Sequence, residues 1–197
     1  QGVMGESPIH AGLALTAMSF AWPTGGFIAG SALLHMSYRK SSSLGSVMLI
    51  AGTLMMALLS LSFGANWAIA SAFFMGLGMG LTNMGFFVAI QANVDWHQRG
   101  LVTATFNYSR IIGQSIGTAV FGGILNAGLS AYLTGDGDLV ARMMSPEFRD
   151  TLPAETVAPL MAEFDHALHI VFVILVALAA AVMVIGLLLP KGRRLGR

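Results

Sequence analysis

Six side chains recur along one arc of the segment between residues 100 and 129: Thr103, Asn107, Arg110, Gln114, Thr118 and Phe121. Their spacing of three or four residues is that of one face of an α-helix. The arc combines a guanidinium group with amides and hydroxyls, which donate and accept hydrogen bonds. It contains no nucleophile beside a base, so it predicts binding of a polar solute and argues against an enzyme.

Arg110 is a charged residue inside an apolar run. It lies about ten residues, or roughly 15 Å, from the start of its helix. A charge at that depth in a membrane costs about 2.5 to 3.5 kcal/mol, so it should face protein or water. One interpretation is that Arg110 lines a polar cavity together with Asn107 and Gln114. The alternative is that its side chain snorkels, or donates only to carbonyl groups of a neighbouring helix. We favour the cavity.

The elements that must position this arc are apolar and long. The chain has 197 residues, of which 55% are hydrophobic and 10% are charged, and its mean hydropathy is +0.74. Apolar blocks of about 20 residues match the ~30 Å hydrocarbon core of a bilayer, where isolated strands cannot exist. We therefore predict an all-α transmembrane fold with five spans, at residues 11–35, 44–63, 67–94, 100–129 and 166–189.

The cations predict an orientation for these spans. If the spans alternate, seven of the ten Lys and Arg residues fall on one side, namely Arg39, Lys40, Arg99 and the four in the tail 191–197. The opposite side receives the long, acidic connection 130–165. Cytoplasmic loops are enriched in Lys and Arg. We thus expect a multi-pass protein of the inner (plasma) membrane, with the N-terminus and the loop 130–165 outside and the tail in the cytoplasm.

Small residues form rows on three of the predicted spans. On span 11–35 the row is Gly12, Thr16, Ser19, Pro23, Gly26 and Gly30, and Trp22 lies off it as a candidate for the cavity. This row is either a close-packing seam or the face of a bent gating helix with its kink at Pro23. Packing roles are also expected for Gly76 and Gly80 on span 67–94 and for Gly113 and Gly117 on span 100–129.

Polar side chains also occur on these three spans. On span 67–94 the candidates that would line a cavity are Thr82, Asn83 and Gln91. Spans 44–63 and 166–189 have almost no polar side chain in their apolar runs, so we expect them to face lipid. No cofactor, nucleic acid or metal ion is expected. Asp165, His166 and His169 cluster at a membrane boundary but lack further ligands for a metal.

The segment 98–126 resembles the penultimate span of the major facilitator superfamily (MFS), in the branch of fourteen-span drug:proton antiporters. Similar features are Gly5-Glu6-Ser7-Pro8, the glycines at 76, 78 and 80, and the long loop before a last span that ends at Pro190. The resemblance implies that the five spans are core helices eight to twelve, with spans 11–35, 67–94 and 100–129 around a central cavity. The segment 30–40 lacks the acidic residue of the family pattern, so no conformational latch is expected there.

Together with this resemblance, the observations predict the C-terminal portion of a proton-coupled transporter that exports small organic or drug-like molecules by alternating access. Such a fragment needs the lipid bilayer and a missing N-terminal half, whose acidic residues, as the resemblance implies, would carry the protons. The chain begins at Gln1 without a basic leader segment, so we expect it to start within a longer protein. Two alternatives stay open: a non-transporting subunit or truncated scaffold, and a metabolite uptake permease of the same fold.

Overall fold

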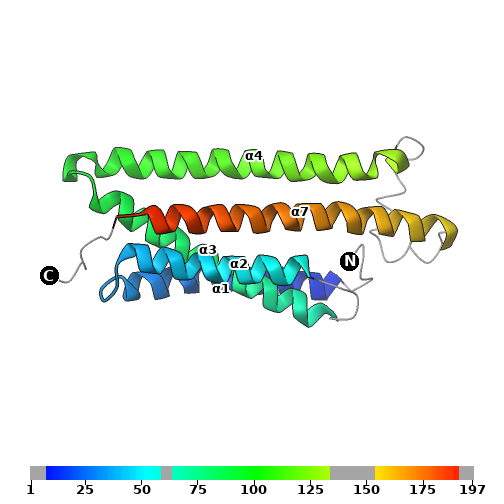
Figure 1. Cartoon of the computed structure of the whole chain (residues 1–197), viewed down its shortest axis with the longest axis horizontal. Coiled ribbons are helices and arrows are strands. Elements are labelled where there is room, and N and C mark those ends of the chain that lie inside the picture. The colour runs from blue at the N-terminus through cyan, green and yellow to red at the C-terminus, as the bar shows by residue number, and fades with distance from the viewer. Residues whose placement is uncertain (1–7, 59–63, 134–153, 191–197) are drawn as a thin grey trace.

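The computed structural model describes residues 8–58, 64–133 and 154–190 (Figure 1). These residues form the helices α1 (Pro8–Ala32), α2 (Tyr38–Ala57), α3 (Gly64–Ala92), α4 (Arg99–Leu133) and α7 (Ala154–Leu188). A short 3₁₀ helix, η1 (Trp96–Gln98), joins α3 to α4. The described part of the chain is helical and contains no strand, as the apolar blocks predict.

The helices differ from the predicted spans chiefly at the long connection. Residues 130–133 still belong to α4, and α7 begins at Ala154, so both ends of the predicted loop 130–165 are helical. Residues 154–165 of the predicted loop form one helix with the last apolar run, because α7 continues without interruption from Ala154 to Leu188.

Two helical segments in the described residues are long and apolar enough to cross a membrane, Asn66–Ala92 in α3 and Asp165–Leu188 in α7. The helices α1, α2 and α4 also have the length of a span, with 25, 20 and 35 residues. Their serine, threonine, glycine and charged residues lower their hydropathy. That these three helices cross the membrane therefore stays a prediction.

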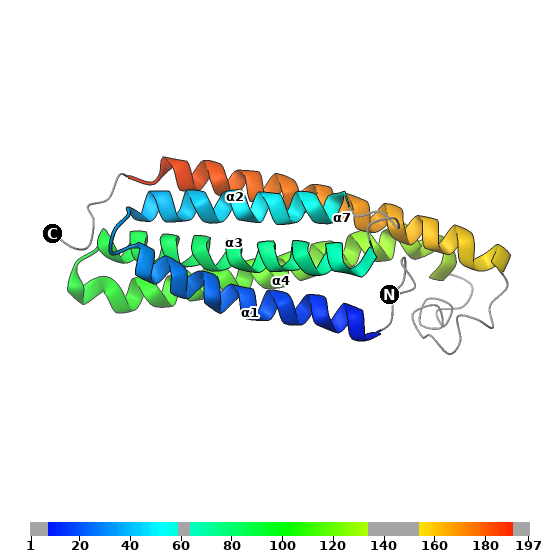
Figure 2. The same ribbon diagram turned by 90° about the horizontal axis from the view of Figure 1, so that it is seen from below.

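The helix α3 lies between α1 and α2, and its glycines allow both to approach closely (Figure 2). A Cβ atom placed on Gly76 would lie 2.7 Å from the carbonyl oxygen of Met18 in α1. One on Gly78 would lie 2.8 Å from the carbonyl oxygen of Gly45 in α2. Gly80 is equally close to the backbone of α1. Alternate glycines of α3 thus serve two different helix contacts.

The row of small residues predicted on α1 is not its contact face with α3. A Cβ atom on Gly12 or Gly26 would meet no described atom within 4 Å, and one on Gly30 would meet only Met84 Cε, at 3.8 Å. The close contact is made by Gly25, whose Cβ would lie 2.5 Å from the carbonyl oxygen of Leu77. Ala21 and Ala29 are fully buried beside it. Pro23 is exposed, and α1 is continuous through it.

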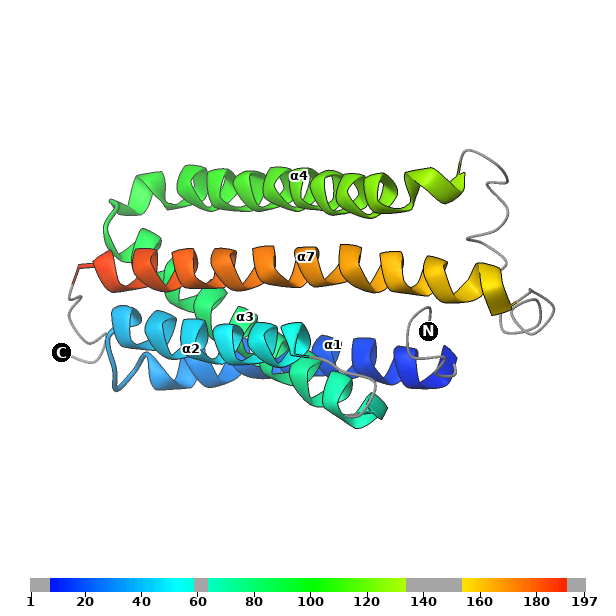
Figure 3. The ribbon, with the colours of Figure 1, turned by 45° about the vertical axis from the view of Figure 1, so that its right-hand side comes forward.

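The helix α2 is more buried than its sequence suggested, because it lies between α3 and α7 (Figure 3). Ser41, Ser42 and Ser46 have no exposed surface. The expectation that span 44–63 faces lipid was therefore wrong for the side of α2 that carries Ser46 and packs against α3 and α7. The hydroxyl of Ser46 donates to the carbonyl of Ser42 at 2.8 Å, so a small polar residue can be buried in a helix contact without a partner on the next helix.

The α1–α2 and α3–α4 connections and the C-terminal end of α7 lie at the same end of the molecule (Figure 1). This end carries the described cations Arg39, Lys40 and Arg99. The start of α1, the end of α2, the start of α3 and the end of α4 lie at the opposite end (Figure 1). The helices therefore alternate in direction, as the charge argument assumed, and the assignment of the cation-rich end to the cytoplasm stays a prediction.

Candidate functional site

The N-terminal third of α4 is held against the C-terminal third of α3 by two side-chain contacts. The Nε2 atom of Gln91 donates to Oγ1 of Thr103 at 2.9 Å. That hydroxyl in turn donates to the carbonyl of Arg99 at 2.7 Å. The rings of Phe87 and Phe106 pack beside this pair, with their centroids 5.6 Å apart. Gln91 and Thr103, both candidates for the polar lining, are thus partners of one another.

Arg110 reaches from α4 to α1. The central carbon of its guanidinium group lies 5.8 Å from the centroid of the Trp22 ring. A guanidinium over an indole face is attracted by the negative face of the ring, and arginine favours this geometry because its planar group can stack. The sequence named both residues as candidates for the cavity, but only the structure brings them together.

These contacts determine which way the arc of α4 faces. Thr103 contacts α3 and Arg110 contacts α1, so the side of α4 that holds both is turned toward those two helices. Asn107 lies between them, and Gln114 and Thr118 follow one and two turns later at helical spacing on the same side. The Thr118 hydroxyl donates to the carbonyl of Gln114 at 2.9 Å, whereas the amides of Asn107 and Gln114 are exposed.

Asn83 faces the same region from α3. It precedes Phe87 by one turn and Gln91 by two, and both of those side chains contact α4. Thr82, the next candidate along, is on another face: it is 6% exposed and lies against Gly45 of α2. It therefore does not share a face with Asn83. We call Trp22, Asn83, Asn107, Arg110 and Gln114 the polar face between α1, α3 and α4.

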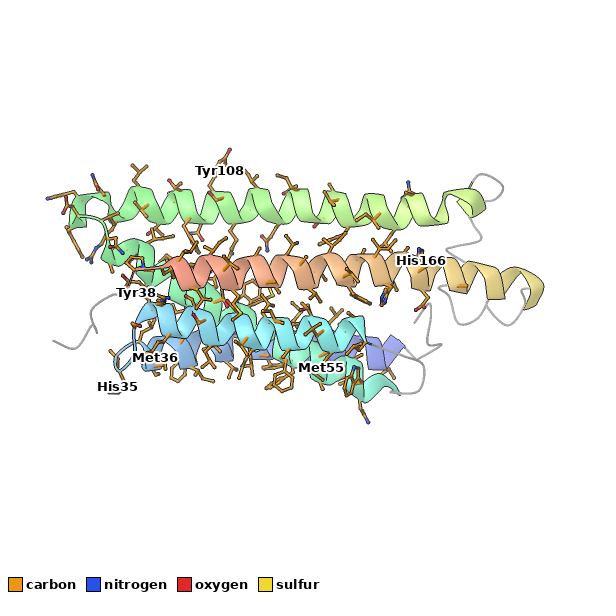
Figure 4. The ribbon with its side chains drawn as sticks, in the orientation of Figure 1. His35, Met36, Tyr38, Met55, Tyr108 and His166 are labelled. Carbon is orange, nitrogen blue, oxygen red and sulfur yellow. The ribbon has the colours of Figure 1, made fainter. Side chains whose placement is uncertain are left out.

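Among the described helices α4 packs mainly on α7, and much of its remaining surface is exposed. A Cβ atom on Gly113 or Gly117 would meet no described atom within 4 Å. Ile111 and Ile116 are 57% and 59% exposed, and Tyr108 points away from α7 (Figure 4). The close packing expected at Gly113 and Gly117 thus has no counterpart among the described helices, and it stays a prediction for a partner helix.

The charges around the polar face are uneven. Among the described residues, Arg110 forms no ion pair, and its guanidinium lies over the Trp22 ring. Asp95 and Asp165 lie toward the ends of the helices, in the α3–α4 connection and in α7. No group of three His, Asp or Glu side chains in the described part could hold a metal ion. The polar face therefore combines one positive charge with neutral amides and an aromatic ring.

A second polar group, at the contact between α2, α3 and α7, was not predicted apart from Thr82. The hydroxyl oxygens of Ser41, Ser42 and Thr82 are buried and have no hydrogen-bond partner among the described residues. The signal for it is the run Ser41-Ser42-Ser43 followed by Gly45, which is small enough for close helix packing.

Comparison with known proteins places this chain beside membrane transporters. It is 26% identical over 155 residues to the multidrug transporter protein MdtP of Bacillus subtilis, covering 79% of this chain and 27% of the relative. It is also 27% identical over 121 residues to an uncharacterised MFS-type transporter in each of two Mycobacterium tuberculosis strains, CDC 1551 and H37Rv, covering 59% of this chain and 18% of each relative. No family model and no solved structure matches the chain.

All three relatives are named as transporters. The chain spans about a quarter or less of their length, since it covers 27%, 18% and 18% of them. The similarity supports a relation to MFS-type transporters and a place in a membrane. It does not extend to the mechanism of coupling.

Proposed function

We propose that this chain is the C-terminal portion of a proton-coupled MFS transporter that exports small organic molecules. In this proposal the five long helices are the last five of a fourteen-span drug:proton antiporter, and the polar face between α1, α3 and α4 lines the path of the solute. The N-terminal half supplies the other wall of that path. Alternating access arises as the two halves rock against each other.

The contact between Arg110 and Trp22 carries this proposal. It turns the arc of α4 toward α1 and α3 although α4 makes few other contacts with those helices. An arginine in the middle of an apolar helix is costly when it faces lipid, and such residues commonly mark solute pathways. The exposed amides of Asn107 and Gln114 on the same side add hydrogen-bonding groups of the kind that orient a bound solute.

One relative supports a broad substrate range by analogy. MdtP of Bacillus subtilis is named as a multidrug transporter, and this chain aligns with 27% of its length. Protons need an ionisable carrier within the membrane. The nine carboxylates of this chain lie outside the middle of the predicted spans, so the proposal assigns proton transfer to acidic residues of the N-terminal half.

Transport by the complete gene product tests the proposal. The protein is reconstituted in liposomes, and the movement of two fluorescent dyes, one cationic and one anionic, is followed after a pH gradient is imposed. We expect at least one dye to move in the direction opposite to the protons, and to stop when an ionophore collapses the gradient. Empty liposomes are the control.

The other outcomes separate the alternatives. A scaffold or non-transporting subunit would leave the distribution of both dyes unchanged. Uptake of a metabolite would show movement of solute in the same direction as the protons. Either result, obtained with correctly folded protein, contradicts the proposal.

A further inference from the structure

The polar face between α1, α3 and α4 carries a positive charge that no described carboxylate balances. We propose that Arg110 and Trp22 form a recognition site for an aromatic organic anion, in which the guanidinium binds the anionic group and the indole stacks with the ring. This names the substrate class of the transporter proposed above, and it rests on that function.

The geometry leaves Arg110 free to bind an anion while it stays on the ring. The central carbon of the Arg110 guanidinium lies over the Trp22 ring, 5.8 Å from its centroid. The N–H donors of a guanidinium lie around the edge of its plane, and those of Arg110 have no acceptor among the described residues. Two of them in parallel match the oxygens of a carboxylate, sulfonate or phosphate. Arg110 is exposed, so a solute can reach that edge.

Neighbouring residues provide apolar walls and hydrogen-bonding groups for an aromatic solute. The ring of Phe106 lies one turn before Arg110 on α4 and packs against Phe87 of α3. Together with Trp22, these rings provide apolar walls on α1, α3 and α4. Asn107 and Gln114, on the two sides of Arg110, present exposed amides that can bind polar substituents.

The same charge disfavours a cationic solute. A positively charged solute would meet Arg110 with no described carboxylate in the middle of these helices to offset the repulsion. Like charges brought together are a common means of rejecting a wrong ligand. The site should therefore distinguish two ligands of the same shape by the sign of their charge.

Fluorescein and rhodamine 6G make this comparison, because both have a xanthene ring system but one is an anion and the other a cation at neutral pH. Binding of each dye to the complete purified gene product in detergent is measured by fluorescence polarisation. We expect fluorescein to bind at least about tenfold more tightly, as expected when one charge-assisted hydrogen bond is gained.

Variants then connect the preference to the two residues. Arg110→Ala should weaken fluorescein binding at least about tenfold and leave rhodamine 6G binding unchanged or tighter. Arg110→Lys should retain part of the affinity, because the charge remains but the planar group is lost. Trp22→Phe should bind better than Trp22→Ala, since it retains a ring. Ile111→Ala, next to Arg110 but off the polar face, is the matched control.

The possible results distinguish a failure of the anion site from a failure of the proposed transport function. If rhodamine 6G is transported and fluorescein neither binds nor moves, the transporter stands and the anion site is overturned. If fluorescein binds in an Arg110-dependent way but no solute moves, the site stands and the transport proposal fails. An unchanged fluorescein affinity in folded Arg110→Ala and Arg110→Lys proteins, for example because a carboxylate elsewhere in the protein neutralises Arg110, would also overturn the site.

Discussion

At the scale of single residues, Arg110 is unusual because its environment differs from that of every other described cation. Arg39, Lys40 and Arg99 lie at the end of the helices, where water can solvate them. The guanidinium of Arg99 also lies over the Trp96 ring, at 5.1 Å from the ring centroid. Arg110 lies within α4, and its guanidinium lies over the ring of a tryptophan of another helix. Its free energy in a membrane therefore depends on the contact with α1.

We expect Arg110→Ala to lower the rate of solute export by the complete gene product while its amount in the membrane stays the same. Arg110→Lys should restore only part of the rate, because lysine cannot stack and bind in a bidentate way at once. Ile111→Ala lies about 100° further around the helix and should have a smaller effect. Normal transport by the alanine variant would exclude a role for Arg110 in the solute path.

At the scale of helices, α3 is the element against which α1 and α2 are placed. Its glycines approach α1 on one side and α2 on the other, and its C-terminal third contacts α4. Glycine within a helix is unfavourable compared with alanine by roughly 0.5 to 1 kcal/mol, and close helix packing offsets that loss. The α4 contact, in contrast, depends on a few larger side chains.

Gly80→Ala should destabilise the protein by about 1 to 3 kcal/mol, the usual cost of overpacking. The added Cβ would collide with the backbone of α1 at Trp22 and Gly26, which cannot move without shifting the helix. Gly30→Ala is the matched control on the same helix pair, since its Cβ would meet only Met84 Cε at 3.8 Å. Thermal unfolding in detergent measures both. Equal stability of the two variants would show that α1 and α3 are less closely packed.

The hydrogen bond between Gln91 and Thr103 should couple α3 to α4 by about 0.5 to 1.5 kcal/mol. A double-mutant cycle with Gln91→Ala, Thr103→Ala and both together measures this coupling from the free energy of unfolding. The cycle is needed because Thr103 also donates to the carbonyl of Arg99, and its loss alone removes two contacts. Additive effects would mean that the two side chains do not interact.

At the scale of the whole molecule, three of the four described Lys and Arg residues lie at one end of the helices, and α4 has exposed apolar side chains along much of its length. The first feature predicts orientation, since Lys and Arg are enriched on the cytoplasmic side. The second fits a helix that meets lipid or a further helix of a longer protein. Both features describe how the chain meets its surroundings: the first its orientation in a membrane, the second the contact of α4 with lipid or a further helix.

Orientation can be measured with single cysteines, because the chain contains none of its own. An impermeant maleimide added to intact cells should label Asp138→Cys, in the predicted outer loop, and should not label Lys40→Cys. After the cells are opened, both positions should react, which confirms that each cysteine is accessible. Labelling of Lys40→Cys alone in intact cells would reverse the predicted orientation.

These 197 residues alone should not perform proton-driven transport, because their carboxylates lie outside the middle of the predicted spans. The chain reconstituted in liposomes is compared with the complete gene product under the same pH gradient. Dye movement driven by the gradient with the short chain would contradict the assignment of proton transfer to other parts of the protein.

From the sequence alone, the helical class could be predicted, because apolar blocks of span length favour helices in a membrane. The alternation of the helices was a premise of the charge argument, and it is seen in the structure (Figure 1). A period of three or four residues relates the residues of one helix to each other, so it places Thr103, Asn107 and Arg110 on one side of α4.

Only the tertiary structure decided what each helix face meets. On α1 the contact face runs through Ala21, Gly25 and Ala29 and not through the row that includes Gly26, although both rows contain small residues. On α2 the serines are buried between two helices, and Arg110 lies on Trp22. The physical reason is that the rotation of one helix about its axis is set by packing against helices distant in sequence, which no local period contains.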